Sequence, residues 1–326
     1  MSKVLITGGA GMIGSNLAKR MVKDGHDVVV VDNLWRGRLE NLSFENEKHV
    51  IDLSTNFYNI DLREQGSIDQ LLKRVDYVFH LADVVAGIGY VFSNQGSIFR
   101  DNFLINTNVF NAVRKNKVKG LLYVGTACSF PAHKQFGANS PPLKEEDQYP
   151  ANPESAYGWS KLMGEYEALL LAKETSIPTS ILSLHNVYGA PCDFNPRTSQ
   201  VIPSLITKAI KWPEEEFTVW GNGDQGRAFI HIDDVVEAIM LSFGIGFEGG
   251  LIQIGPKVCT TIREIAETIV NISGKDICIK YDLTKPEGDG GRCADFSKAS
   301  DILGWKPEVE LAKGLNDLYF WIKNKL

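Results

Sequence analysis

Short apolar runs alternate with helical patterns over the first 185 residues of the chain. Five runs, at 4–6, 28–31, 77–80, 121–124 and 179–184, have the length and composition of buried strands. Helical patterns lie between them, at 12–22, 68–74, 98–115 and 155–174. Strands that alternate with helices favour a parallel sheet covered on both faces. The first half of the chain is therefore predicted to be α/β.

The alternation breaks after residue 184. The predicted elements there are a polar loop at 189–203, a helix at 201–211, an acidic turn at 213–216, short strands near 217–220 and 228–231, a helix from Asp233, a flexible connector at 244–250, a capped helix at 260–273, a loop at 287–292 and an amphipathic helix at 311–325. Thr261 and Glu264 have capping-box spacing at the start of the capped helix. We predict a Rossmann-type doubly wound parallel sheet with a smaller mixed α/β lobe. The nucleotide-binding domain is placed at 1–185, with 229–245 packing back on it, and the substrate-binding lobe at 186–326.

Composition and charge narrow the class of protein. The chain has 326 residues, 44% hydrophobic and 23% charged, which suits one large or two ordinary globular domains. The net charge of −6 argues against a general nucleic-acid partner. We find no leader pattern and no apolar stretch of about 18–20 residues, so we expect a cytoplasmic protein with no membrane partner. The five cysteines are scattered, and no spacing suggests a metal site.

A glycine-rich turn joins the first predicted strand to the first predicted helix. Gly8 permits a tight turn, Gly11 lets the backbone approach a pyrophosphate, and Gly14 lets the helix pack closely. The free N–H groups of the helix start, at Met12 and Ile13, would bind the phosphates. Asp32 ends the second strand, 18 residues after Gly14. A carboxylate there accepts a hydrogen bond from a ribose 2′-hydroxyl and repels a 2′-phosphate, so the predicted cofactor is NAD rather than NADP.

Tyr157 and Lys161 are four residues apart on a predicted helix, which puts them on one face. Thr126 follows the strand at 121–124. A hydroxyl, a tyrosine and a lysine in this order form an acid–base set: the lysine cation favours the phenolate and lowers the tyrosine pKa. The alternative is an incidental Tyr/Lys pair on a surface helix. The glycine turn in the same chain favours the acid–base set.

These motifs resemble the extended short-chain dehydrogenase/reductase family, whose main members are nucleotide-sugar epimerases and dehydratases. The resemblance covers nearly the whole chain. It implies an NAD-binding group of Gly8, Gly11, Met12, Ile13, Gly14, Asp32, Asp61, Leu62, Leu81, Ala82, Asp83, Asn102, Tyr157 and Lys161. It also implies a nucleotide-sugar group of Asn186, Gln200, Val201, Arg227 and Arg292. The arginines would bind a diphosphate, since the guanidinium fork suits phosphate. Surface salt bridges are the alternative role for them.

The residues after Thr126 discriminate within the family. Related dehydratases place Asp-Glu there, whereas this chain has Ala127 and Cys128, so dehydration lacks its acid. The segment 128–131 instead resembles the GDP-mannose 3,5-epimerase and GDP-fucose synthase families, in which this cysteine is a base acting at C3 and C5. GDP-fucose synthase uses NADPH, which Asp32 argues against. The resemblance thus implies an NAD-dependent epimerase that oxidises C4 of a GDP-linked, mannose-like hexose or heptose. A small buried cysteine without a catalytic role is the alternative for Cys128.

One position departs from those families. They place a lysine or histidine, as the opposing acid, where this chain has Gln200. An amide supplies no proton near neutral pH. Another group, or water, supplies it, or the chemistry stops at C4 and the enzyme is a 4-epimerase or a C4 dehydrogenase. A non-catalytic NAD-binding regulator is a further alternative, although such chains usually lose the tyrosine or lysine. The resemblance also implies a homodimer formed through the helices at 98–115 and 155–174.

Overall fold

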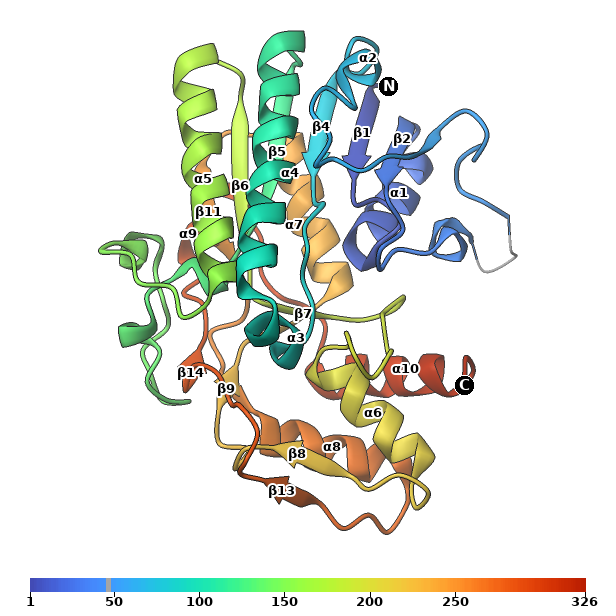
Figure 1. Cartoon of the computed structure of the whole chain (residues 1–326), viewed down its shortest axis with the longest axis vertical. Helices are drawn as coiled ribbons and strands as arrows, with labels where there is room; N and C mark the ends of the chain where they lie inside the picture. The colour runs from blue at the N-terminus through green and yellow to red at the C-terminus, as the bar shows by residue number, and fades with distance from the viewer. Residues whose placement is uncertain (45–47) are drawn as a thin grey trace.

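A parallel sheet forms the centre of the computed structural model, which describes residues 1–44 and 48–326 (Figure 1). Its seven strands are β1 (Lys3–Thr7), β2 (Asp27–Asp32), β3 (Phe57–Asn59), β4 (Tyr77–His80), β5 (Gly120–Thr126), β6 (Thr179–Leu184) and β11 (Gly250–Ile254). Their order across the sheet is β3-β2-β1-β4-β5-β6-β11, and every neighbouring pair is parallel. This order confirms the predicted Rossmann-type fold.

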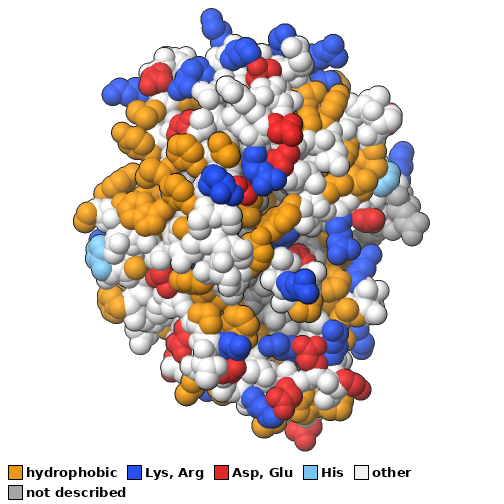
Figure 2. Space-filling view, viewed as in Figure 1, with side chains coloured by type: hydrophobic (Ala, Val, Ile, Leu, Met, Phe, Trp, Pro, Cys, Tyr) orange, Lys and Arg blue, Asp and Glu red, His pale blue; other side chains and the backbone are white. Residues whose placement is uncertain are grey.

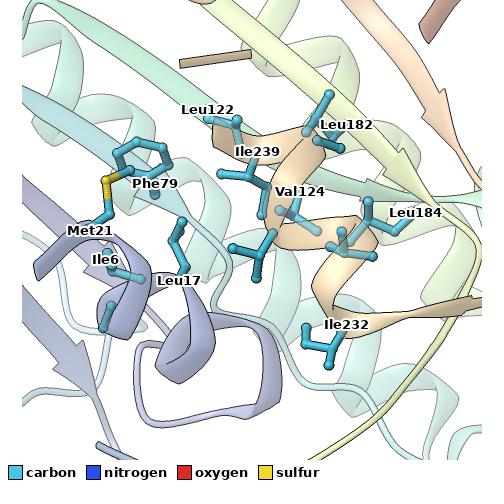
Figure 3. Close-up of a cluster of buried hydrophobic side chains, with 14 of the residues drawn as sticks. Ile6, Leu17, Met21, Phe79, Leu122, Val124, Leu182, Leu184, Ile232 and Ile239 are labelled. Atoms are coloured by element: carbon cyan, nitrogen blue, oxygen red, sulfur yellow. The ribbon is translucent and has the colours of Figure 1, made fainter. Parts of the chain in front are cut away.

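Helices cover both faces of the sheet. The long helices α4 (Gln95–Asn116) and α5 (Ala156–Thr175) lie on one face, and α1 (Met12–Lys23) and α7 (Ile232–Gly244) lie on the other. Strand residues alternate between the two resulting cores: Ile6 packs with the α1–α7 layer, whereas the adjacent Leu5 packs with the α4–α5 layer. Figure 3 shows the first core, where side chains from β1, β4, β5 and β6 meet those of α1 and α7. Strands apolar on both sides are what a doubly covered sheet requires.

A smaller lobe lies below the sheet in Figure 1 and has its own core. Its helices are α6 (Val201–Lys211), α8 (Ile262–Ser273) and α10 (Leu311–Lys323). Its short strands pair as β8 (Thr218–Trp220) with β13 (Lys280–Asp282), and as β12 (Thr260–Thr261), β9 (Gly226–Arg227) and β14 (Gly291–Arg292) in one three-stranded sheet. The capping box at the start of α8 is present as predicted, with the side chains of Thr261 and Glu264 each accepting from the other's backbone N–H.

The remaining elements connect the two regions. They are α2 (Asp69–Leu72), α3 (Ile88–Ser93), α9 (Ser297–Leu303) and the parallel pair of β7 (Asn186–Tyr188) and β10 (Phe229–His231). Several elements, among them β3, α3 and α9, are not predicted by the sequence analysis, and two outcomes differ from an expected element. Residues 250–254, just beyond the expected connector, form the seventh strand of the central sheet, and the expected loop at 287–292 contains β14. None of the helices in the described residues combines the length and hydropathy that crossing a membrane requires.

Candidate functional site

The chain reverses its winding direction between β1 and β4, and the turns that follow these strands lie against each other. Gly8 has a φ of +67°, and a Cβ there would lie 2.9 Å from the backbone of Ala82. Only a glycine allows both the left-handed conformation and this close approach. A crevice forms where the connections that follow two neighbouring strands lead to opposite faces of the sheet. Open α/β sheets bind their ligands in such crevices.

A single cavity of about 2280 Å³ extends from this crevice into the smaller lobe. It exceeds the roughly 300–1000 Å³ of an ordinary small-molecule pocket, so two ligands can share it. It is lined by most of the predicted residues: Gly8, Gly11, Met12, Ile13, Gly14, Asp32, Asp61, Leu62, Leu81, Ala82, Asp83, Thr126, Cys128, Tyr157, Asn186, Gln200, Val201, Arg227 and Arg292. Two predicted residues, Asn102 and Lys161, are buried behind this lining.

The glycine turn fits the phosphates of a dinucleotide. Helix α1 begins after Gly11 with no side-chain cap and no acidic residue in its first turn, so its positive end faces the cavity uncompensated. A Cβ at Gly14 would lie 2.3 Å from the carbonyl oxygen of Gly8. The helix can therefore approach the turn only if this residue is glycine, as the sequence analysis expects. An uncapped helix start lined by glycine is a favourable anion site.

Asp32 fits the ribose next to those phosphates. Its carboxylate accepts the backbone N–H of Ala10 at 3.0 Å and that of Leu34 at 2.8 Å, one on each oxygen. Each oxygen keeps a lone pair for a hydroxyl of a ligand. Burial raises the pKa of Asp32, although both backbone bonds act to lower it. Asp61 lines the same end of the cavity and forms an ion pair with Arg63, which lowers the pKa of Asp61.

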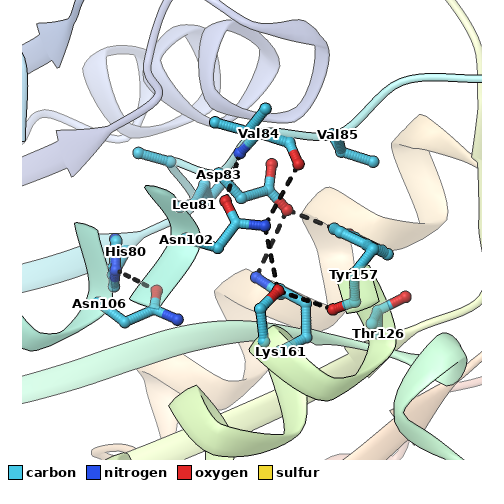
Figure 4. Close-up of polar contacts among 12 residues, drawn as sticks. His80, Leu81, Asp83, Val84, Val85, Asn102, Asn106, Thr126, Tyr157 and Lys161 are labelled. Atoms are coloured by element: carbon cyan, nitrogen blue, oxygen red, sulfur yellow. Dashed lines mark hydrogen bonds and ion pairs between the residues drawn. The ribbon is translucent and has the colours of Figure 1, made fainter. Parts of the chain in front are cut away.

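Tyr157 and Lys161 converge on the carboxylate of Asp83 (Figure 4). The Tyr157 hydroxyl donates to Asp83 Oδ2 at 3.1 Å, and Lys161 Nζ lies 3.5 Å from the same oxygen. Burial, followed by the charge on Asp83, raises the pKa of Tyr157 well above 10. The sequence analysis expects the lysine to lower the tyrosine pKa; the net shift in this arrangement is upward, because burial dominates and the Asp83 carboxylate adds to it.

Buried polar side chains fix the segment that carries Asp83. Thr7 Oγ1 accepts the backbone N–H groups of Leu81 and Ala82, each at 3.2 Å, and bonds His80 Nδ1 at 2.8 Å. The side-chain amide of Asn102 bonds both backbone groups of Val84, the residue after Asp83: it accepts the N–H and donates to the carbonyl oxygen. Asn102 therefore orders the cavity wall from behind instead of lining it.

Thr126 and Cys128 lie at the carboxyl end of β5, beside Tyr157 in the cavity. Thr126 Oγ1 accepts the backbone N–H of Cys128 at 3.3 Å, which fixes the turn between them. Arg292 donates to the carbonyl oxygen of Ala127 at 3.4 Å. Burial lowers the pKa of Arg292, but the neighbouring Cys128 and then Asp289 raise it, with a net increase.

Arg227 and Arg292 are brought together by the pairing of β9 with β14, in which they are register partners. Both side chains are buried at the cavity wall. Burial, followed by the charge of Arg292, lowers the pKa of Arg227 to about 10. The Nε atom of Arg292 has no hydrogen-bond partner among the residues that the structure describes. Two crowded guanidinium groups with an unused donor suit an anionic ligand such as a diphosphate.

Several cavity residues were not found by the sequence analysis. Glu154 accepts the backbone N–H of Asp289 at 3.1 Å, and burial and the neighbouring Asp289 raise the pKa of Glu154 to about 7. Arg36 bonds the carboxylate of Asp193 at 3.2 Å and joins the loops after β2 and β7 at the cavity. No local motif marks these pairs, since their partners are far apart in the chain.

Comparisons with known proteins agree with this geometry. The family model described as "NAD dependent epimerase/dehydratase family" matches residues 4–255. GDP-mannose 3,5-epimerase of Arabidopsis thaliana is 32% identical over 325 residues, covering 99% of this chain and 83% of its own length. UDP-glucose 4-epimerase of Thermotoga maritima, solved with UDP-glucose, has a TM-score of 0.85 at 26% identity and 99% coverage of both chains. A mutant of UDP-glucuronic acid 4-epimerase from Bacillus cereus, solved with NAD and a substrate analogue, has a TM-score of 0.81 at 27% identity, covering 99% of this chain and all of its own.

Proposed function

The chain belongs to the NAD-dependent epimerase/dehydratase family, and from this premise we propose that it oxidises C4 of a GDP-linked sugar, epimerises C3 or C5 of the 4-keto intermediate, and reduces C4 again. The sugar is a mannose-like hexose or a heptose. The observation that carries the proposal is the position of Cys128, which lies in the same cavity as Tyr157 and against the guanidinium of Arg292. The full-length relative named GDP-mannose 3,5-epimerase supports the GDP-linked substrate.

At the cofactor end of the cavity, different residues bind the pyrophosphate, the ribose and the adenine of NAD. Gly8, Gly11 and Gly14 let the start of α1 bind the pyrophosphate, and Asp32 accepts the adenosine ribose hydroxyls. Asp61 and Leu62 border the adenine. When bound, NAD supplies a reversible hydride acceptor for C4 of the sugar.

The substrate end holds the diphosphate and moves protons. Arg227 and Arg292 bind the diphosphate, with Asn186 and the start of α6 beside them. Thr126 orients the C4 hydroxyl, and Tyr157 receives its proton as C4 is oxidised. The 4-keto group acidifies the protons on C3 and C5. Cys128, beside Arg292, acts as the base that removes one of them.

Gln200 supports the second candidate, in which the chemistry stops at C4. Its amide lines the cavity at the start of α6 but cannot return a proton to the opposite face of the sugar. Without another donor, the products would be those of a 4-epimerase or of a C4 dehydrogenase. Structural neighbours named UDP-glucose 4-epimerase and UDP-glucuronic acid 4-epimerase support this second candidate.

Incubation with GDP-mannose and related GDP- and UDP-sugars in D₂O, followed by NMR and absorbance at the NADH band, tests the proposal. We expect deuterium at C3 or C5 with no net NADH. A Cys128→Ser variant is expected to lose about 100-fold in C3/C5 exchange while still reducing bound NAD in a single turnover. Accumulation of NADH or of a 4-keto sugar without C3/C5 exchange would contradict epimerisation and favour the second candidate. Gain of exchange in a Gln200→Lys variant would identify the missing acid as the reason.

We also propose that the enzyme is a homodimer that pairs through α4 and α5. These helices expose a group of large apolar side chains: Phe99, Phe103, Leu104, Trp159, Tyr166, Leu169 and Leu170. Figure 2 shows hydrophobic side chains gathered over this part of the molecule. Large exposed apolar patches in such proteins mark interaction surfaces.

A further inference from the structure

The Asp83 carboxylate has a contact that binding a cofactor does not require. Asp83 Oδ2 receives the Tyr157 hydroxyl and lies within ion-pair distance of Lys161. Lys161 is almost completely buried, with its Nζ 4.5 Å from the centre of the Tyr123 ring. The backbone on both sides of Asp83 is fixed by Thr7 and Asn102. The phenol therefore points its proton at a carboxylate whose position is set by the fold.

Among the described residues, no charged group other than Asp83 accepts a hydrogen bond from the Tyr157 hydroxyl. Lys161 has no lone pair when protonated. The groups facing the pair are Tyr123 from β5, Cys128 after β5, and Glu165 from α5. Glu165 is held instead by Thr126, Ser129 and Gln148. The direction of proton transfer from Tyr157 is therefore towards Asp83.

We propose that Asp83 stores the C4 proton during the reaction and that Tyr157 relays it. As the C4–H bond breaks and its electron pair leaves with the hydride, the C4 O–H proton passes to the Tyr157 oxygen. The phenol proton passes at the same time to Asp83, which becomes a neutral carboxylic acid. Reduction of the 4-keto group reverses both transfers. The inference rests on the proposed C4 oxidation and adds the group that holds the proton.

This relay changes what the tyrosine must do. In a site with only a tyrosine and a lysine, the phenolate must be present before the sugar reacts. Here the neutral phenol is the working form, and the base is the carboxylate behind it. The enzyme should then be active below the pH at which the Tyr157 phenolate forms, since the proton acceptor is the Asp83 carboxylate and not a phenolate. The stored proton is also kept available for the return step.

An Asp83→Asn variant tests the relay because the amide keeps the size of the side chain but cannot accept the proton. We expect kcat at pH 7 to fall about 100-fold or more, and to rise about tenfold per pH unit above neutrality as the phenolate forms by losing its proton to solvent. Wild-type kcat should be flat over the same interval. Added formate should restore activity to Asp83→Ala. Glu167→Gln is the matched control, since its carboxylate lies on α5, bonds Thr107 and is outside the cavity.

A measurement without substrate separates the relay from the proposed function. The phenolate absorbance of Tyr157, taken as the difference between each protein and its Tyr157→Phe counterpart, should titrate far above pH 10 in the wild type and at lower pH in Asp83→Asn. If Asp83→Asn is as active as the wild type at pH 7, Asp83 is not the store and the proposal is overturned. If the wild type acts on no nucleotide sugar, the proposed function fails, and a Tyr157 titration unchanged by Asp83→Asn would overturn the relay as well.

Discussion

Glu165 lies one turn beyond Lys161 on α5 and is buried beneath the turn that carries Thr126 and Cys128. Its Oε1 accepts the backbone N–H of Thr126 at 3.2 Å, and its other oxygen accepts from the amide of Gln148. A Cβ at Gly125 would lie 2.3 Å from Oε1, so β5 leaves room for the carboxyl group by ending in a glycine–threonine pair. No cation lies within ion-pair distance of Glu165 in the described part of the chain.

Hydrogen bonds and burial act on the pKa of Glu165 in opposite directions. Ser129 Oγ donates to the carbonyl oxygen of Thr126 at 2.7 Å and lies 3.2 Å from Glu165 Oε1, to which its hydrogen is also directed. The bonds that Glu165 accepts from Thr126, Gln148 and Ser129 lower its pKa, but burial is the larger effect and raises the pKa from 4.5 to about 7.

The raised pKa makes a definite contribution to stability. Because the folded-state pKa lies above the unfolded value, the contribution is complete below pH 4.5 and is lost as the pH rises through 7. At about 1.4 kcal/mol per pKa unit, the change from 4.5 to about 7 amounts to about 3 kcal/mol. A Glu165→Gln variant has no such proton to lose. The wild type should therefore lose about 3 kcal/mol relative to this variant between pH 4.5 and 8.

Urea unfolding of both proteins at fixed concentration across pH 4.5–8 measures this difference. The free energy of unfolding of the variant will differ from that of the wild type by a further amount, since its amide NH₂ can face the NH₂ group of Gln148. That further amount does not depend on pH. Glu174→Gln is the control: its carboxylate is exposed near the end of the same helix and pairs with Arg114. A wild-type-minus-Glu165→Gln difference that stays constant across this range would refute the reasoning.

Three further predictions concern the cofactor and the assembly. Gly14→Ala should weaken NAD binding at least tenfold in a fluorescence titration, because the new Cβ would lie 2.3 Å from a backbone oxygen; unchanged affinity would contradict the close approach. Arg36→Ala should speed NADH release about fivefold in stopped-flow fluorescence, and adding Asp193→Asn should have little further effect if the two act as a pair. Phe103→Glu should give a monomer by light scattering at concentrations where the wild type is a dimer, whereas Phe136→Glu, exposed on another segment, should not.

The strand, turn and helix pattern near the amino terminus was sufficient to predict that the proposed cofactor residues line one cavity. Gly8, Gly14 and Asp32 are close in sequence, and their geometry is set by one strand–turn–helix unit. The same holds for Tyr157 and Lys161, which a single helix places on one face. Local periodicity therefore predicts such sites well.

Contacts between distant segments could not be predicted in this way. The upward shift of the Tyr157 pKa was not predicted, because burial and the Asp83 carboxylate cause it. Asp83 comes from the turn after β4, and no spacing in the sequence relates that turn to α5. Strand β11 was missed for a similar reason, since it is stabilised by pairing with β6, about 70 residues earlier in the chain. A pKa depends on every charge within a few ångströms, whatever its place in the chain.

In the segment at 287–292, the local sequence predicts one structure and contacts with distant segments produce another. Its glycines and charges predict a loop, yet Gly291 and Arg292 pair with β9. This pairing places Arg227 and Arg292 on one wall of the cavity. A Cβ at Gly291 would lie 1.8 Å from the carbonyl oxygen of Gly137, so the glycine is needed for packing against the segment after β5. That packing also places Arg292 against the backbone of Ala127, next to Cys128. One short strand thus links the proposed diphosphate site to the proposed base at C3 and C5, so a substrate held by its diphosphate would contact the side chain that lies beside Cys128.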